Sequence, residues 1–161
     1  MSKPISAEEK EYDDGKRREV LSLFPPLGFS VETEGNATRF FIVSDCNERF
    51  AVINVVKKRS DKSYVLFDRE EHGFPRKLFD DAKRVNYNKS LLIVHERDSG
   101  KTYYGWLPKL RDYLRFELSE KMEKRAEGKN PGMVFCAKSA LKEFDGDLEK
   151  VLRDFEYFPI R

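Results

Sequence analysis

Four charged residues between positions 19 and 57 have the types and spacing that metal-dependent chemistry on a phosphodiester needs. Glu19 falls in a predicted helix, Asp45 at the end of a predicted strand, Glu48 in the following loop and Lys57 at the end of the next strand. Carboxylates can hold Mg²⁺ against a scissile phosphate, and a lysine can orient the attacking water or stabilise developing charge. These residues converge if the two strands are neighbours. The competing interpretation is a set of solvated side chains, because 37% of the residues are charged.

Other catalytic signatures in the sequence are incomplete. Residues 99–102 (SGKT) resemble the end of a phosphate-binding loop, but the first glycine is missing and two predicted strands flank the segment, which favours a turn. His95 is expected to be a half-exposed strand residue, and Cys136 a core residue. Cys46 lies in a loop, and no catalytic base can be assigned to it. Two cysteines and two histidines are too few for a repeated zinc site.

The charge balance excludes a uniformly basic surface. The 161 residues include 31 Lys and Arg against 29 Asp and Glu, a net charge of +2. Acidic residues dominate 8–14, whereas basic residues gather at 57–62 and 76–89, which leaves room for one positive face. Nearby tyrosines and Trp106 could stack on bases or could belong to the core. The candidate nucleic-acid contacts are Lys57, Lys58, Arg59, Lys62, Arg76, Lys77 and Arg84.

The chain has the features of an intracellular protein. It contains no apolar run long enough to span a membrane, and its polar N-terminal segment lacks the apolar stretch of a secretory signal. We therefore expect a soluble, cytoplasmic protein without membrane contacts.

Hydrophobic periodicity predicts a mixed α/β domain. It indicates a central mixed sheet of about five strands, flanked by helices, with a helical C-terminal extension. The predicted regions are a flexible tail over 1–14, a core over 15–126 and an extension over 127–161. The predicted helices are 16–24, 76–85, 107–126 and 148–155, the last capped by Asp147, and the predicted strands are 29–33, 39–44, 50–56, 63–68, 90–97, 102–106 and 133–137.

This order of elements resembles the PD-(D/E)XK nuclease superfamily. Members of that superfamily have a helix that carries a glutamate, a strand that ends near an aspartate, a strand that carries (D/E/Q)-x-Lys, a further helix and a further strand. This sequence has the same order, with Glu19, Asp45, Lys57, the predicted helix at 76–85 and the predicted strand at 90–97. The stretch GKRREVLSLFPPLGFSV is also similar to the opening of Holliday-junction-resolvase-like members. The resemblance covers roughly residues 15–115.

The resemblance implies a restriction-endonuclease-like fold and Mg²⁺-dependent hydrolysis of DNA. Asp45, Lys57 and Glu19 would be the catalytic residues, and Asp45, Glu48 and Asn54 would bind the metal. The motif departs from the family at Val55, which stands where an acid or glutamine precedes the lysine by two positions. Asn54 would be a neutral ligand, or else a sheet residue bonded to its neighbours.

Three functions remain open from the sequence. The first is a Mg²⁺-dependent endonuclease. The second is a catalytically inactive nuclease-like module that binds nucleic acid, DNA rather than RNA, or a protein partner such as a second copy of the chain. The third is a structural or interaction protein whose charges are all solvated.

Overall fold

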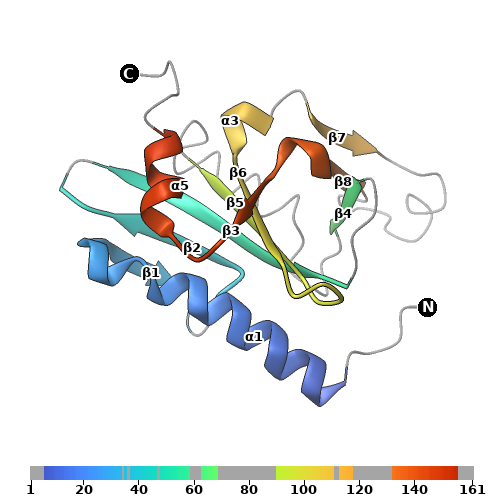
Figure 1. The fold of residues 1–161 in the computed structure, drawn as a ribbon, viewed down its shortest axis with the longest axis horizontal. Helices are drawn as coiled ribbons and strands as arrows, with labels where there is room; N and C mark the ends of the chain where they lie inside the picture. The colour runs from blue at the N-terminus through green and yellow to red at the C-terminus, as the bar shows by residue number, and fades with distance from the viewer. Residues whose placement is uncertain are drawn as a thin grey trace.

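A six-stranded mixed sheet and a smaller three-stranded sheet organise the chain (Figure 1). The strand order in the large sheet is β1-β2-β3-β5-β6-β9, and β4-β8-β7 form the small one. The computed structural model describes residues 6–33, 35, 37–46, 48–58, 63–68, 90–110, 113–117 and 132–155. The strands are β1 (Ser30–Thr33), β2 (Phe40–Ser44), β3 (Arg49–Lys57), β4 (Ser63–Asp68), β5 (Leu91–Glu96), β6 (Thr102–Trp106), β7 (Leu114–Glu117), β8 (Gly132–Ala137) and β9 (Lys142–Phe144).

The predicted mixed α/β class is confirmed. In the large sheet β3 and β5 run parallel, and the other neighbouring strands are antiparallel. Residues 50–55 of β3 and all of β5 are buried, as expected of strands covered on both faces. The strand at 63–68 forms as predicted, but it pairs with β8 in the small sheet rather than joining the central one. The predicted helix at 76–85 lies outside the described residues.

Helix α1 (Ala7–Ser22) begins nine residues earlier than the sequence predicted. The Ser6 hydroxyl caps the helix: it accepts a hydrogen bond from the Glu9 amide at 3.1 Å and donates one to the Glu9 carboxylate at 3.3 Å. Residues 7–14, predicted to be part of a flexible tail, are therefore helical. The helix ends before the short 3-10 turn η1 (Pro25–Leu27), because prolines do not continue it, and Gly28 turns the chain with φ of 94°.

The long helix predicted over 107–126 is wrong. Of the described residues in this range, only those of α3 (Leu107–Leu110) are α-helical, and 114–117 instead form β7, which pairs with β8. Leucines at helical spacing suggested the helix, but the segment Leu-Arg-Phe-Glu also alternates apolar and polar residues, as a strand does. Pairing with β8 decides between the two patterns, and such a partner cannot be identified from local sequence.

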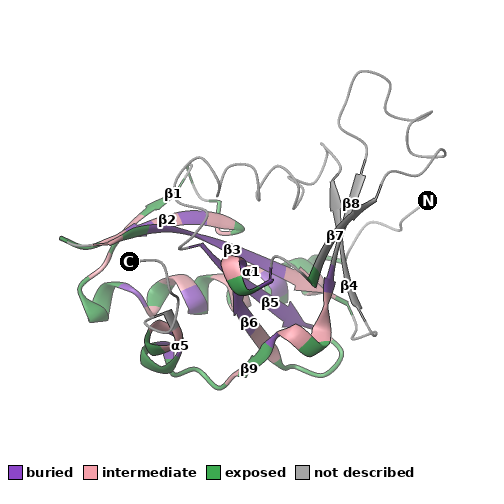
Figure 2. Cartoon of the chain, turned by 90° about the horizontal axis from the view of Figure 1, so that it is seen from above, coloured by how far each residue is buried: buried purple, intermediate pink, exposed green. Residues whose placement is uncertain are grey.

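The large sheet has an apolar core on each face. Helices α1 and α5 (Leu148–Phe155) cover one face with side chains such as Val20 and Val151. Leu107, Leu110 and Cys136 pack on the other face, and the buried residues follow the central strands in Figure 2. The predicted burial of Cys136 is confirmed.

Hydrogen bonds hold helix α5 at its first turn and along the side that faces β6. Asp147 caps it as predicted, accepting hydrogen bonds from the amides of Glu149 and Lys150. The Trp106 indole donates a hydrogen bond to the Val151 carbonyl at 3.0 Å, which ties the helix to β6. No helix among the described residues is long and apolar enough to cross a membrane.

Candidate functional site

The fold separates the residues predicted to form a metal site. Asp45 and Glu48 shape the turn between β2 and β3, where the Glu48 amide donates to the Asp45 carboxylate at 2.6 Å. Because β2 and β3 are antiparallel, Ser44 pairs with Arg49 at the start of β3, whereas Lys57 is at its end. At about 3.3 Å per residue, Asp45 and Lys57 are roughly 25 Å apart along the strand. The expected convergence of these residues is therefore not met.

Glu19, the third predicted catalytic residue, faces solvent. Its side chain is 71% exposed and pairs with Lys16 on the same helix at 3.8 Å. Across the described ranges, no group of three or more His, Cys, Asp and Glu side chains has the arrangement of a metal site.

Asn54 bridges α1, the segment just before β2, and β5. Its side-chain amide nitrogen donates to the Arg17 carbonyl at 3.0 Å and to the Thr38 carbonyl at 3.1 Å. The Asn54 side-chain oxygen lies 2.8 Å from Nε2 of His95. The interpretation of Asn54 as a sheet residue bonded to its neighbours is confirmed, and both ends of its amide are engaged by protein groups.

The hydrogen bond from His95 to Asn54 also determines which nitrogen of the His95 ring carries the proton. Since carbonyls only accept hydrogen bonds, the Asn54 oxygen must accept the one from His95, so Nε2 carries the proton. Nδ1 of the neutral ring then accepts from the Thr102 hydroxyl at 2.9 Å. Burial, with the positive charges of Lys16 and Arg17, lowers the pKa of His95 to about 4. His95 is 2% exposed, so its predicted half-exposure is wrong; the bonds to Asn54 and Thr102 allow it to be buried.

The candidate nucleic-acid contacts are described only in part. Lys57 and Lys58 lie at the end of β3, with Lys58 exposed, whereas Arg59, Lys62, Arg76, Lys77 and Arg84 lie outside the described residues. Of the aromatic residues considered for stacking, Tyr104 and Trp106 belong to the core. Tyr103 is half-buried, and the Lys138 ammonium lies 4.9 Å from the centre of its ring.

Charged residues gather where the two parallel strands end. We call Lys57, Lys58, Glu96, Arg97 and Lys138 the carboxyl-end cluster. Register places Lys57 beside Glu96, and the Arg97 amide donates to the Lys57 carbonyl at 2.9 Å. Glu96 is buried, and its carboxylate lies 3.5 Å from the Lys138 ammonium. Ligands of open α/β sheets bind at the carboxyl ends of their parallel strands, so this cluster is the candidate functional site.

Sequence reasoning identified two members of the carboxyl-end cluster and missed three. Lys57 and Lys58 were selected because they end an apolar run. Glu96 and Arg97 likewise follow a later apolar run, at 91–94. Their place at the end of an apolar run was the signal in the sequence that could have identified Glu96 and Arg97. Lys138 comes from a distant segment, the 3-10 turn η5 (Lys138–Ala140), and no local pattern points to it.

Positive charges crowd one another at the carboxyl-end cluster. Burial, together with the charge of Arg97, lowers the pKa of Lys57 to about 8. A half-buried lysine next to a second cation favours a bound anion, because the anion stabilises the protonated form. The arrangement suits a phosphate group.

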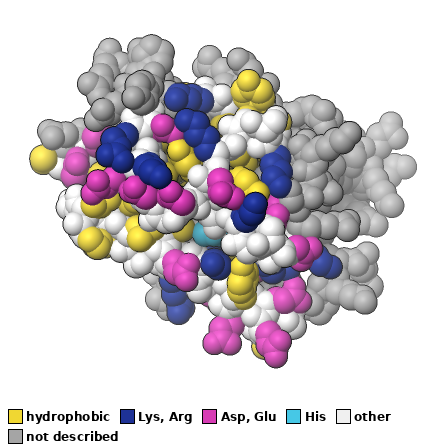
Figure 3. Space-filling model, in the orientation of Figure 1, with side chains coloured by type: hydrophobic (Ala, Val, Ile, Leu, Met, Phe, Trp, Pro, Cys, Tyr) yellow, Lys and Arg dark blue, Asp and Glu magenta, His cyan; other side chains and the backbone are white. Residues whose placement is uncertain are grey.

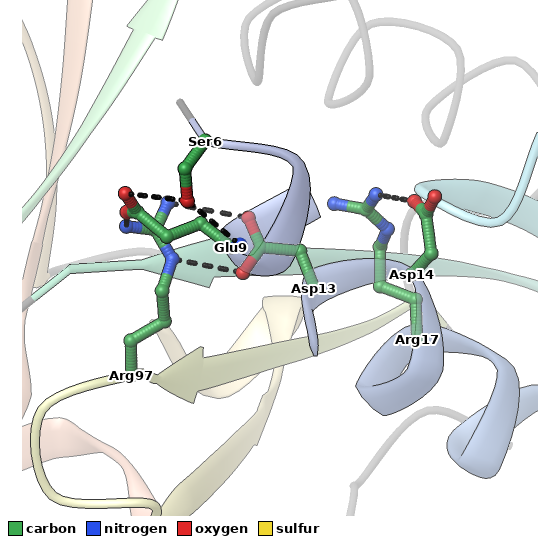
Figure 4. Close-up of polar contacts among 6 residues, drawn as sticks. All are labelled: Ser6, Glu9, Asp13, Asp14, Arg17 and Arg97. Atoms are coloured by element: carbon green, nitrogen blue, oxygen red, sulfur yellow. Dashed lines mark hydrogen bonds and ion pairs between the residues drawn. The ribbon is translucent and has the colours of Figure 1, made fainter. Parts of the chain in front are cut away.

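Arg97 also joins the cluster to α1 (Figure 4). Its guanidinium donates to the Glu9 carboxylate at 2.7 Å and to both carboxylate oxygens of Asp13, at 2.8 and 3.2 Å. The Asp13 side chain is 7% exposed and that of Arg97 17%. The first half of α1 is thus held against the turn between β5 and β6.

Comparison with known proteins gives no relative for this arrangement. None of the protein-family models, curated proteins and solved structures that were compared with the chain matches it.

Proposed function

We propose that the chain acts in the cytoplasm as a nucleic-acid-binding module that contacts DNA phosphates through the carboxyl-end cluster. The observation that carries this proposal is Lys57, a half-buried cation at the end of a parallel strand, beside Arg97. Phosphate groups account for most of the affinity of proteins for DNA, and lysine and arginine supply it.

The order of elements supports a nuclease-like module. Helix α1, strands β2 and β3 and the parallel strand β5 follow one another as the resemblance to the PD-(D/E)XK superfamily implies. Lys57 ends β3, the strand that carries the lysine in that resemblance.

Binding is a better interpretation than Mg²⁺-dependent hydrolysis. Asn54, which would complete the metal site, uses its amide to hold Arg17, Thr38 and His95. Asp45 lies at the opposite end of β3 from Lys57. The positions from which metal ligands were expected therefore serve the fold.

The test is DNA affinity of a Lys57→Gln variant, measured by fluorescence anisotropy with labelled 20-mer duplexes and single strands, and with RNA of the same sequence. The matched control is Lys150→Gln, which removes an exposed lysine of α5, away from the end of β3 (Figure 1). We expect DNA affinity to fall about tenfold in Lys57→Gln, with a salt dependence shallower by about one charge, and to change little in Lys150→Gln.

Three outcomes would contradict the proposal. Wild-type protein that does not bind DNA at 50 mM salt would exclude the binding function, and equal affinities of the two variants would exclude the site. Cleavage of DNA with Mg²⁺ that disappears in Lys57→Gln would establish hydrolysis instead.

A further inference from the structure

The first half of α1 is unusually acidic for a segment packed beside a cationic site. Residues 8–14, which we call the acidic segment, contain five carboxylates and one lysine (EEKEYDD), and Lys16, Arg17 and Arg18 follow. Figure 3 shows acidic and basic side chains intermingled over the face that carries α1, without separation into patches. The acids are therefore placed where they can neutralise cations of this chain.

Three carboxylates of the acidic segment bind arginines directly. Glu9 and Asp13 contact Arg97, and Asp14 contacts Arg17 on the next turn of the helix (Figure 4). A guanidinium bound by two carboxylates has the geometry that it would use for the oxygens of a phosphate group. The acidic segment thus occupies Arg97 as a phosphate would.

The acidic segment is attached to the body of the protein mainly by these polar contacts. Asp13 is the only buried residue of α1 before Val20, and the apolar anchors Val20 and Phe24 are in or after the second half of the helix. Releasing the acidic segment exposes little apolar surface, so it can separate while the second half of α1 stays packed.

Gly15 divides the two halves of α1. Glycine weakens a helix interior, and a side chain at this position would meet no atom within 4 Å, so packing does not require it. The helix is therefore weakest between the acidic segment and the apolar anchors, where bending or unwinding releases the first half.

From these contacts we propose that the acidic segment is autoinhibitory: it competes with nucleic-acid phosphates for Arg97 and must leave before DNA binds fully. This inference rests on the proposed function. The segment belongs to the same chain as Arg97, so it competes at a high effective concentration and lowers, by one common factor, the apparent affinity of every ligand that needs Arg97 free. A nucleic acid displaces it by offering several phosphates at once.

The first test compares two substitutions of equal charge. Glu9→Gln removes one carboxylate from Arg97 and keeps Asp13, whereas Glu11→Gln removes an exposed carboxylate of the same helix that makes no contact with Arg97. We expect DNA affinity to rise three- to tenfold in Glu9→Gln and less than twofold in Glu11→Gln. Equal gains in the two variants would overturn the inference.

The second test changes no charge. Gly15→Ala strengthens the helix and should hold the acidic segment in place, so DNA affinity should fall up to about fivefold while thermal stability rises. A stabilised variant with unchanged affinity would overturn the inference. Hydrogen exchange of amides 9–14 in the wild-type protein should also become faster when a 20-mer duplex is added; unchanged or slower exchange contradicts release.

The two proposals fail in different ways. Absence of DNA binding by the wild type and by every variant refutes the proposed function, and the autoinhibition with it. Wild-type binding that depends on Lys57 but responds equally to Glu9→Gln and Glu11→Gln refutes autoinhibition alone.

Discussion

His95 should make the protein less stable at mildly acidic pH, and His95→Gln should remove that sensitivity. The native ring is neutral with a pKa of about 4, whereas an unfolded histidine has a pKa near 6.5. Between these values the unfolded chain binds the proton more readily than the native one. Stability is therefore unaffected above about pH 6.5 and falls as the pH drops toward 4.

The size of the effect follows from the difference between the two pKa values. A difference of about 2.5 units, at 1.36 kcal/mol per unit, corresponds to about 3 kcal/mol of unfolding free energy. Glutamine can still donate to the Asn54 oxygen, but it stays neutral throughout this range. We expect His95→Gln to be about 1–2 kcal/mol less stable than the wild type at pH 7, because the contact with Thr102 changes. Between pH 7 and 4.5 the variant should lose about 2.5 kcal/mol less than the wild type, because the rest of the effect appears only below pH 4.5.

Urea unfolding followed by the fluorescence of Trp106 measures this free energy at pH 7, 6, 5 and 4.5. Carboxylates titrate in the same range, so the informative quantity is the difference between wild type and variant. Parallel pH dependences of the wild type and His95→Gln would refute the reasoning that burial and the neighbouring cations keep the ring neutral.

Two further predictions concern packing and capping. Gly105→Ala places a methyl group 2.9 Å from side-chain carbons of Leu110 and Leu141, both in the core. The midpoint of urea unfolding should therefore fall by an amount equivalent to about 1–2 kcal/mol of unfolding free energy. An unchanged midpoint would show that the two leucines move aside freely. Asp147→Ala removes the acceptor for two amides at the start of α5 and should cost about 1 kcal/mol in the same assay, whereas a variant as stable as wild type would mean that solvent replaces the cap.

Strands could be predicted from the sequence wherever local pattern and tertiary environment agree. β3 and β5 are apolar runs whose ends match the structure within a residue or two, because strands buried on both faces have little polar sequence. The helix predicted over 114–117 was wrong because local pattern and tertiary environment disagree there. There the helical spacing of leucines and the alternation of a strand coexist, and β8, about twenty residues away, determines the outcome.

The site was less predictable than the strands because it depends on strand direction. Lys57 was identified from its place at the end of an apolar run, but Asp45 was paired with it on the assumption that neighbouring strands bring their ends together. That holds for the parallel neighbours β3 and β5, which bring Lys57 beside Glu96, and fails for the antiparallel hairpin of β2 and β3. Whether two neighbouring strands run parallel or antiparallel depends on the topology of the whole sheet, which local sequence does not reveal.

The near-neutral charge of the chain bears on how DNA binding should respond to salt. Each phosphate that a lysine or arginine contacts releases a counterion from the DNA, and this release steepens the salt dependence. If DNA displaces Glu9 and Asp13 from Arg97, the freed carboxylates gather cations and offset part of that release. Glu9→Gln removes one such carboxylate, so it should bind DNA more tightly and with a steeper salt dependence than the wild type. Removal of a repulsive surface charge also steepens the salt dependence, because salt screens repulsion as well as attraction. Competition for Arg97 therefore predicts a larger steepening in Glu9→Gln than in Glu11→Gln, whereas general electrostatics predicts equal changes in the two variants.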